Sequence, residues 1–138
     1  MQLAARMRLA VLRLARRLRQ QAEVDVTPSM QSVLATLERV GPATFGELAE
    51  LERVRPPTIT RIVARLEGDG LVKRETDNRD RRVSYVRLTR EGRQLMRRTR
   101  SRKDLFLVER LARLDEDQLA ALENAVEALE RLLDEEPE

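Results

Sequence analysis

The 138-residue chain contains no cysteine and no histidine. It therefore cannot form disulfides, sense oxidation through a thiol or use a thiolate nucleophile, and it lacks imidazole bases and the usual zinc ligands. Aromatic residues are nearly as scarce, with two Phe, one Tyr and no Trp. This scarcity argues against binding of single-stranded RNA, because that recognition depends on stacking bases on aromatic rings. We expect no metal and no cofactor.

Two further kinds of pattern are missing. No apolar run is long enough for a transmembrane helix. There is also no phosphate loop, no nucleotide-binding glycine pattern and no recognisable pair of catalytic carboxylates, so we expect that the protein is not an enzyme.

The first 21 residues are Arg-rich and free of acids. A mitochondrial transit peptide or a membrane-surface helix is therefore the alternative to an ordinary first helix.

Charge is abundant and unevenly distributed. The whole chain carries a formal charge of only +3. Residues 53–103, however, contain 17 Lys or Arg and 6 Asp or Glu, whereas residues 115–138 contain one Arg and 10 acids. A concentrated basic field raises both the affinity and the association rate for a polyanion. The length of the chain predicts one domain. We expect a polyanionic partner to bind at the middle of this domain.

A short helix is predicted at about residues 56–68. It begins at Pro56 and Pro57, because proline is tolerated in a first helical turn, and it ends at residues 68–70, where a glycine can adopt the left-handed cap. Its apolar residues have the spacing of a helix buried on one side: Ile59, Ile62, Val63 and Leu66. The other face is small, hydroxylated or cationic: Pro57, Thr58, Thr60, Arg61, Ala64, Arg65 and Gly68. Such a face suits close approach to the major groove of DNA, which admits a helix.

Two β-rich segments follow, at residues 71–75 and 83–88, joined by a polar loop at residues 76–82. The loop contains three arginines and two aspartates: Asp77, Arg79, Asp80, Arg81 and Arg82. An extended arginine can enter the narrow minor groove, and a neighbouring carboxylate can hold its guanidinium in one orientation. The alternative is a charged hairpin that only keeps an edge strand soluble.

Five further helices are predicted around this stretch. The first runs from about residue 3 to 22, and the second starts at Thr27-Pro28 and stops at residues 41–42. A capping box, Thr44-x-x-Glu47, opens a third helix that ends near residue 51. After the hairpin, Thr89 is a plausible N-cap for a helix that reaches about residue 114, and Asp115-x-x-Gln118 opens the last one. The helices at about 45–51 and 56–68 form a helix-turn-helix.

Four ordered motifs resemble the multiple antibiotic resistance regulator (MarR) family of winged helix-turn-helix repressors. They are Pro57-Thr58-x-Thr60-Arg61, Leu66-Glu67-x-x-Gly70-Leu71-Val72, Asp77-x-Arg79-Asp80-x-Arg82 and Leu88-Thr89-x-x-Gly92. With the flanking helices, the likeness covers nearly the whole chain. It implies a mainly α fold with a small β-hairpin wing. A winged helix-turn-helix at residues 27–104 would be flanked by helical dimerisation regions at 1–24 and 105–138.

The resemblance also implies how DNA is bound. The reading helix at about 56–68 would enter the major groove and the wing at 76–83 the minor groove. Arg82, oriented by Asp80, is the first choice for the minor-groove arginine. Arg79 and Arg81 are second choices, expected rather on phosphates, and Lys73 and Arg74 would reach the DNA backbone. The complete set of expected DNA-binding residues is Arg55, Pro57, Thr58, Thr60, Arg61, Arg65, Lys73, Arg74, Arg79, Asp80, Arg81 and Arg82.

Apolar stripes mark both terminal helices. The first carries Met7, Val11, Leu14 and Leu18, and the last carries Leu119, Leu122, Val126, Leu129 and Leu133. The second set repeats at intervals of 3, 4, 3 and 4, as in a helix that packs against other helices. Because these stripes exceed what one small winged-helix core requires, they predict a homodimer. An intramolecular helix hairpin is the alternative.

These features favour a homodimeric, sequence-specific regulator of transcription that binds double-stranded DNA. The resemblance implies that its operator is pseudo-palindromic and that the protein is a ligand-responsive repressor, cytoplasmic and associated with the nucleoid when bound to DNA. The sequence does not identify the small-molecule effector or its pocket. The alternative is a winged-helix module that binds protein through its basic surface. A salt titration separates the two, because phosphate contacts make affinity fall steeply with salt concentration.

Overall fold

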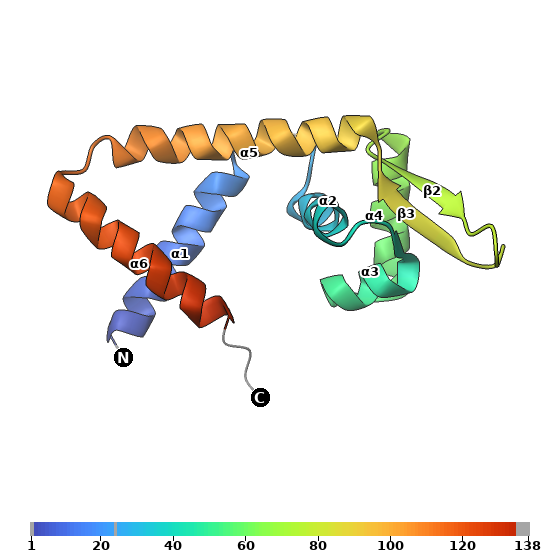
Figure 1. The fold of residues 1–138 in the computed structure, drawn as a ribbon, viewed down its shortest axis with the longest axis horizontal. Helices are drawn as coiled ribbons and strands as arrows, with labels where there is room; N and C mark the ends of the chain where they lie inside the picture. The colour runs from blue at the N-terminus through green and yellow to red at the C-terminus, as the bar shows by residue number, and fades with distance from the viewer. Residues whose placement is uncertain (1, 24, 135–138) are drawn as a thin grey trace. The chain divides into compact units, whose positions relative to one another are not determined.

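The structure is a computed structural model that describes residues 2–23 and 25–134 (Figure 1). The elements are α1 (Gln2–Arg19), α2 (Pro28–Val40), β1 (Ala43–Thr44), α3 (Phe45–Glu52), α4 (Pro56–Gly68), β2 (Val72–Thr76), β3 (Ser84–Leu88), α5 (Arg90–Leu111) and α6 (Glu116–Asp134). The predicted fold, mainly helical with a β wing, is confirmed. The chain divides into two compact units, residues 1–103 and 104–138, which are described separately.

The helices begin where the capping residues predict. Thr27 accepts a hydrogen bond from the N–H three residues later (3.2 Å) and is followed by Pro28 in the first turn of α2. In α3, Thr44 Oγ1 accepts from the Glu47 N–H (3.1 Å), and the Glu47 carboxylate accepts from the Thr44 N–H (3.3 Å). The same reciprocal pair opens α6, where Asp115 and Gln118 exchange hydrogen bonds of 2.8 and 3.1 Å. Each cap satisfies N–H groups that lack partners within the helix.

Two helices end earlier in the chain than the sequence predicted. The first helix was expected to reach residue 22 and the long helix residue 114, whereas α1 ends at Arg19 and α5 at Leu111. Beyond each end the chain makes i to i−3 backbone bonds, from Ala22 to Arg19 (3.1 Å) and from Leu114 to Leu111 (3.0 Å). Such bonds tighten the final turn beyond α-helical geometry, so the apolar pattern continues for one turn after the helix itself has ended.

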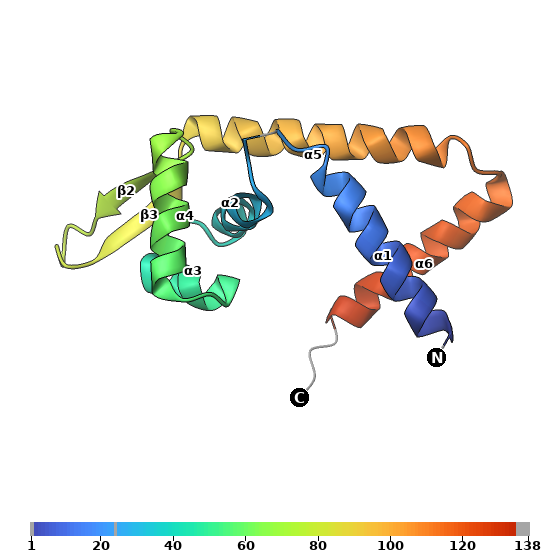
Figure 2. The same cartoon turned by 180° about the vertical axis from the view of Figure 1, so that it is seen from behind.

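The core of residues 1–103 lies where α2, α3 and α4 meet one face of the sheet. Its largest fully buried side chains are Val33, Leu34, Leu48, Ile59, Val63, Leu66, Val72 and Val86. Figures 1 and 2 both show α4 between α2 and the wing strands. The reading helix is therefore fixed by burial of one face, and its opposite face is left exposed.

The sheet has three strands, not the two that were predicted. Its antiparallel order is β1-β3-β2, and the additional strand β1 pairs Ala43 with Val86. Two residues are too few to show an alternating pattern, so β1 gives no signal in the sequence. The pairing register puts Val72, Arg74, Val86 and Leu88 on the core side and Lys73, Glu75, Tyr85 and Arg87 on the outer side.

Thr89 joins the wing to α5. Its hydroxyl donates to the carbonyl of Gly70 (2.6 Å) and accepts from the N–H of Gly92 (3.1 Å), which agrees with its predicted role as N-cap. The Thr89 N–H donates to the carbonyl of Leu71 (3.1 Å). A Cβ atom added to Gly92 would lie less than 3.0 Å from that Leu71 oxygen, which is closer than real Cβ atoms essentially ever come to another heavy atom. Glycine is required here because the strand backbone passes so close.

Within the second unit, the described residues 104–134 comprise the end of α5 and α6. The Arg110 guanidinium lies 3.6 Å from the centroid of the Phe106 ring, which is the distance range of a cation–π contact. No described residue of α6 is buried. Across the described ranges of the chain, no helix is long and apolar enough to cross a membrane.

Candidate nucleic-acid interface

The reading helix α4 starts from an extended Arg55 (φ −74°, ψ 148°) and carries Pro56 and Pro57 in its first turn. Its apolar side is fully buried at Ile59, Val63 and Leu66. The opposite side is exposed, as predicted: Pro57, Arg61, Ala64 and Gly68. A helix with small side chains on its exposed face can approach another surface closely.

The end of α4 is fixed by a Schellman motif. The Leu71 N–H donates to the Leu66 carbonyl (2.9 Å) and the Gly70 N–H to the Glu67 carbonyl (3.0 Å). Gly70 has φ +75°, the left-handed conformation that this motif requires. The sequence placed the left-handed cap within residues 68–70, and Gly70 is the residue that adopts it. The chain then enters β2, so the wing begins at a defined angle to the helix.

The turn between α3 and α4 rests on contacts that the sequence did not reveal. Glu52, the last residue of α3, accepts hydrogen bonds from Ser32 Oγ (2.5 Å) and Thr36 Oγ1 on α2. Arg53 follows with φ +55°, and among the described residues it is the one non-glycine residue with positive φ. Non-glycine residues reach this conformation at a cost. No local pattern signals the Glu52 contacts, because the three residues meet only through packing of α2 on α3.

The threonines of α4 differ in what they offer a ligand. Thr58 is half-buried. Thr60 is exposed, and its hydroxyl donates to the Pro56 carbonyl one turn earlier (3.0 Å). With its proton used within the helix, the Thr60 oxygen presents acceptor lone pairs to the outside. It is therefore suited to a donor, such as an exocyclic amino group on a base edge.

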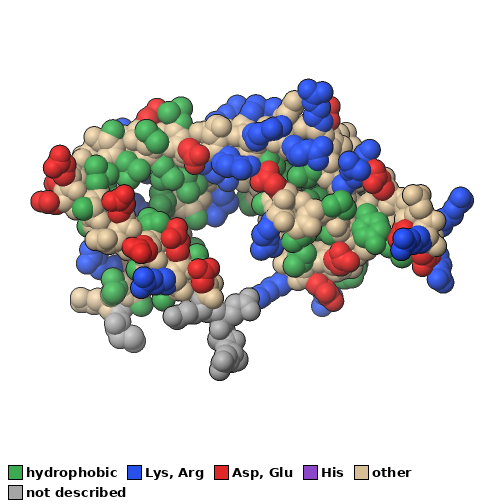
Figure 3. All heavy atoms as spheres, viewed as in Figure 1, with side chains coloured by type: hydrophobic (Ala, Val, Ile, Leu, Met, Phe, Trp, Pro, Cys, Tyr) green, Lys and Arg blue, Asp and Glu red, His purple; other side chains and the backbone are tan. Residues whose placement is uncertain are grey.

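The candidate cations fall into two groups. Over residues 2–23 and 25–134, no carboxylate lies within 4.0 Å of the side-chain nitrogens of Arg55, Arg61, Arg79 or Arg81. The others have acidic partners: Arg65 pairs with Asp69 (3.9 Å), Lys73 with Glu75 (3.5 Å), Arg74 with Glu67 (3.2 Å) and Arg82 with Asp80 (3.1 Å). The first group is available to phosphates at no cost of breaking an ion pair. Figure 3 shows basic side chains gathered at the wing tip and along the start of α5.

The wing loop is ordered by its two aspartates. The Asp77 carboxylate accepts from the Arg79 N–H (2.9 Å). Asp80 accepts from the backbone N–H and the Nε of Arg82 (both 3.1 Å) and from its terminal nitrogen (3.3 Å). The predicted pairing of Asp80 with Arg82 is thus present. These hydrogen bonds, chiefly that from the Arg82 side chain, hold the pKa of Asp80 below its ordinary value. The Arg82 side chain stays 91% exposed, so it is oriented and still accessible.

Lys73 and Arg74 are adjacent in the sequence but lie on opposite faces of β2. Lys73 is on the outer face, where it and Arg87 flank Glu75; the hydrogen bond from Arg87 is the main cause that lowers the pKa of Glu75. Arg74 is on the core side, ion-paired to Glu67 and 5.0 Å from the ring centroid of Phe45. The sequence grouped Arg74 with Lys73, although alternation from the buried Val72 would have separated them.

The residues predicted for dimerisation are unburied within each unit. On α1, Met7, Val11 and Leu14 are exposed and Leu18 is half-buried. On α6, Leu119, Leu122, Val126 and Leu133 are exposed, the last by 81%, and Leu129 is half-buried. Large apolar side chains left open to water are the expected marks of surfaces that another chain covers.

Comparison with known proteins gives a consistent result. The MarR family model matches residues 26–84. An uncharacterized HTH-type transcriptional regulator of Mycobacterium leprae is 41% identical over 136 residues, covering 98% of this chain and 95% of the relative. The chain belongs to the MarR family. An HTH-type transcriptional regulator of Mycobacterium tuberculosis is 38% identical over the same length and coverage.

Solved structures agree with the MarR fold. A Pseudomonas aeruginosa protein assigned as a transcriptional regulator is 36% identical, with a TM-score of 0.87 and coverage of 98% of this chain and 96% of its own. YusO of Bacillus subtilis is 26% identical, with a TM-score of 0.75 and coverage of 94% and 96%. As a MarR-family protein, the chain is a transcriptional regulator with a DNA-binding helix-turn-helix and not an enzyme.

Proposed function

We propose that the protein is a homodimeric repressor that recognises one pseudo-palindromic DNA operator. The observation that carries this proposal is the joint exposure of the α4 face and of Arg55, Arg61, Arg79 and Arg81, which have no acidic partner among the described residues. A similarly folded MepR variant of Staphylococcus aureus, with a TM-score of 0.75 at 20% identity, is bound to an oligodeoxyribonucleotide. That likeness supports DNA as the partner of this chain.

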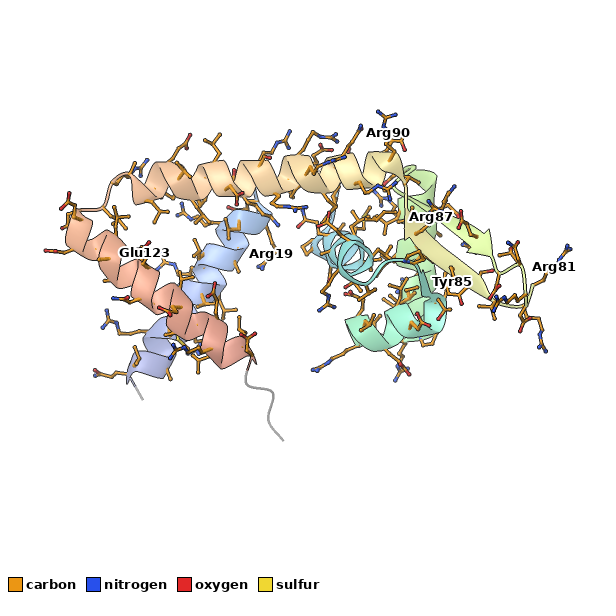
Figure 4. All side chains as sticks on the ribbon, in the orientation of Figure 1. Arg19, Arg81, Tyr85, Arg87, Arg90 and Glu123 are labelled. Atoms are coloured by element: carbon orange, nitrogen blue, oxygen red, sulfur yellow. The ribbon has the colours of Figure 1, made fainter. Side chains whose placement is uncertain are left out.

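Within the operator, α4 (about residues 56–68) occupies the major groove and the wing (76–83) the minor groove. Thr58 and Thr60 contact base edges, and Arg55 and Arg61 bind phosphates at the start of the helix. Arg82 enters the minor groove in the orientation that Asp80 gives it, because a paired guanidinium loses less conformational freedom on binding. Arg79 and Arg81 bind phosphates at the wing tip, from which Arg81 extends in Figure 4.

The two apolar helices supply the dimer. α1 and α6 have no described buried residue, and each carries a largely exposed apolar stripe. A second copy of the chain covers these stripes. Two-fold symmetry then places two α4 helices in successive major grooves, about 34 Å apart, which is why the operator is pseudo-palindromic.

Release by a small ligand is the regulatory part of the proposal. A cleft of about 370 Å³ lies between the end of α2, β3 and the start of α5, and its charged lining residues are Glu38, Arg87 and Arg93. Arg87 already pairs with Glu75 (2.9 Å) and Glu38 with Arg100 (2.9 Å), so Arg93 is the lining cation that favours an anionic molecule. Such a ligand weakens operator binding only if it binds the free and DNA-bound conformations with different affinity. We place the protein in the cytoplasm, associated with the nucleoid when bound.

The test is binding of the purified protein to DNA from upstream of its own gene, compared with a scrambled duplex of equal length and composition. We expect preferential binding by two subunits per site, with affinity that falls steeply between low and high salt. Equal, weak binding to the two duplexes at both salt concentrations, followed by failure to enrich any sequence from genomic fragments, would refute sequence-specific recognition. A monomeric mass in solution would refute the dimer separately.

A further inference from the structure

The Arg74 side chain joins three elements of the DNA-binding unit. It leaves β2 at the base of the wing, and its Nε lies 3.2 Å from the carboxylate of Glu67 in the last turn of α4. Its guanidinium carbon lies 5.0 Å from the centroid of the Phe45 ring, at the first residue of α3. One side chain therefore contacts the wing's own strand, the reading helix and the helix before it.

The register of the sheet explains why Arg74 takes this position. Arg74 pairs with Val86 across the strands, and Val86 is fully buried, so Arg74 lies on the face of β2 that is directed at the core. Lys73, one residue earlier, lies on the opposite face and pairs with Glu75 at 3.5 Å. Of these two adjacent cations, only Arg74 is directed toward the helix-turn-helix.

Phe45 extends the connection to the loop end of the wing. Phe45 lines a cleft of about 470 Å³ whose other walls include Arg82 and Val83, the two residues that precede β3. Phe45 thus meets Arg74 and also borders the segment that carries Arg82.

We propose that Arg74 is a positioning residue which, through Glu67 and Phe45, sets the angle of the wing relative to α4. The inference deepens the proposed function and rests on it, since the purpose of the angle is to bring Arg82 to the minor groove while α4 occupies the adjacent major groove. Arg74 acts through Arg82 and is not itself a phosphate contact. Its charge is already neutralised by Glu67, and its flat guanidinium is the group that stacks on an aromatic ring.

Replacing Glu67 distinguishes positioning from simple charge. Glu67 is a negative charge at the end of the reading helix, so its removal should tighten DNA binding if long-range electrostatics alone decides the affinity. If Glu67 instead holds Arg74 in place, and Arg74 holds the wing, removal of Glu67 weakens DNA binding. The two mechanisms predict opposite signs for Glu67→Met.

The experiment compares operator binding by Arg74→Met and Glu67→Met, each alone and in the Arg82→Ala background. Lys73→Met is the matched control for wing order alone, because Lys73 is itself a candidate DNA contact. We expect Arg74→Met and Glu67→Met to bind the selected operator about five- to tenfold more weakly. In the Arg82→Ala background, each should cost about twofold or less, because a residue that acts through another loses its effect when that partner is gone. Arg74→Lys, which keeps the charge and is the fallback if the Met variant does not fold, should restore only part of the affinity.

Hydrogen exchange without DNA supplies an independent measurement. Amides of residues 77–83 should exchange faster in Arg74→Met and Glu67→Met than in the wild type, and at the wild-type rate in Lys73→Met. Unchanged exchange, tighter binding by Glu67→Met, or an equal cost of Arg74→Met with and without Arg82 would each overturn the positioning role. Failure of the wild type to select any operator would instead refute the proposed function, and the exchange rates would still decide whether Arg74 holds the wing.

Discussion

Gly92 offers a sharp test of how the wing is joined to the long helix. Alanine normally stabilises a helix by about 1 kcal/mol relative to glycine, and Gly92 lies in the first turn of α5. Its added methyl would, however, collide with the Leu71 carbonyl oxygen and approach Leu71 C to 3.1 Å and Leu88 Cδ2 to 3.3 Å. Most of these atoms belong to backbone that is already hydrogen-bonded, so they cannot move aside freely.

The magnitude follows from the groups that must move. Displacing the Leu71 carbonyl breaks its hydrogen bond with the Thr89 N–H, a loss of about 1 kcal/mol. Overpacking the junction adds about 1–3 kcal/mol. After subtraction of the gain in helix propensity, we expect Gly92→Ala to lower the free energy of unfolding by about 1–3 kcal/mol.

Urea denaturation at one fixed protein concentration measures this loss, because the stability of a dimer depends on its concentration. The matched control is Gly68→Ala, at the end of α4, where nothing lies within 4 Å of the added Cβ and φ is not positive. That variant should equal or exceed the wild type by up to about 1 kcal/mol. If Gly92→Ala is as stable as Gly68→Ala, the close approach of Leu71 to α5 does not constrain the protein.

Three further outcomes are expected. Arg82→Ala should weaken operator binding by about 1–3 kcal/mol with an unchanged melting temperature; wild-type affinity would contradict the minor-groove assignment. Replacing both Leu122 and Leu129 with Lys should dissociate or unfold the proposed dimer, since charge in a buried seam is costly, and an unchanged dimer mass by light scattering would show that α6 does not form the proposed interface. The pKa of the Asp80 carboxyl is lowered from 3.8. The ionised carboxylate therefore orders the wing loop fully above pH 3.8, and this contribution is lost as the pH falls through the lowered pKa. Exchange-broadened NMR signals from Arg82 Nε already at pH 5 would contradict this.

Much of the DNA-binding unit was determined locally. The capping residues Thr27 and Thr44 and the prolines at 56–57 set helix starts, because a side chain three residues from an unpaired N–H satisfies it in any protein. The apolar spacing of α4 determined which face is buried, since helical periodicity is a property of the chain itself. The pairing of Asp80 with Arg82 has the same origin, because residues two apart in a tight loop meet without help from the rest of the fold.

Other features depended on segments far apart in the sequence. The strand β1 exists only because β3 passes beside Ala43, and Glu52 meets Ser32 and Thr36 only because α2 packs on α3. The sequence marked Arg74 as one more cation of a basic region, and only the sheet register and the packing of α4 turned it toward Glu67 and Phe45. Local hydrogen bonds and periodicity can be read along the chain, whereas the partner of a side chain is decided by tertiary packing.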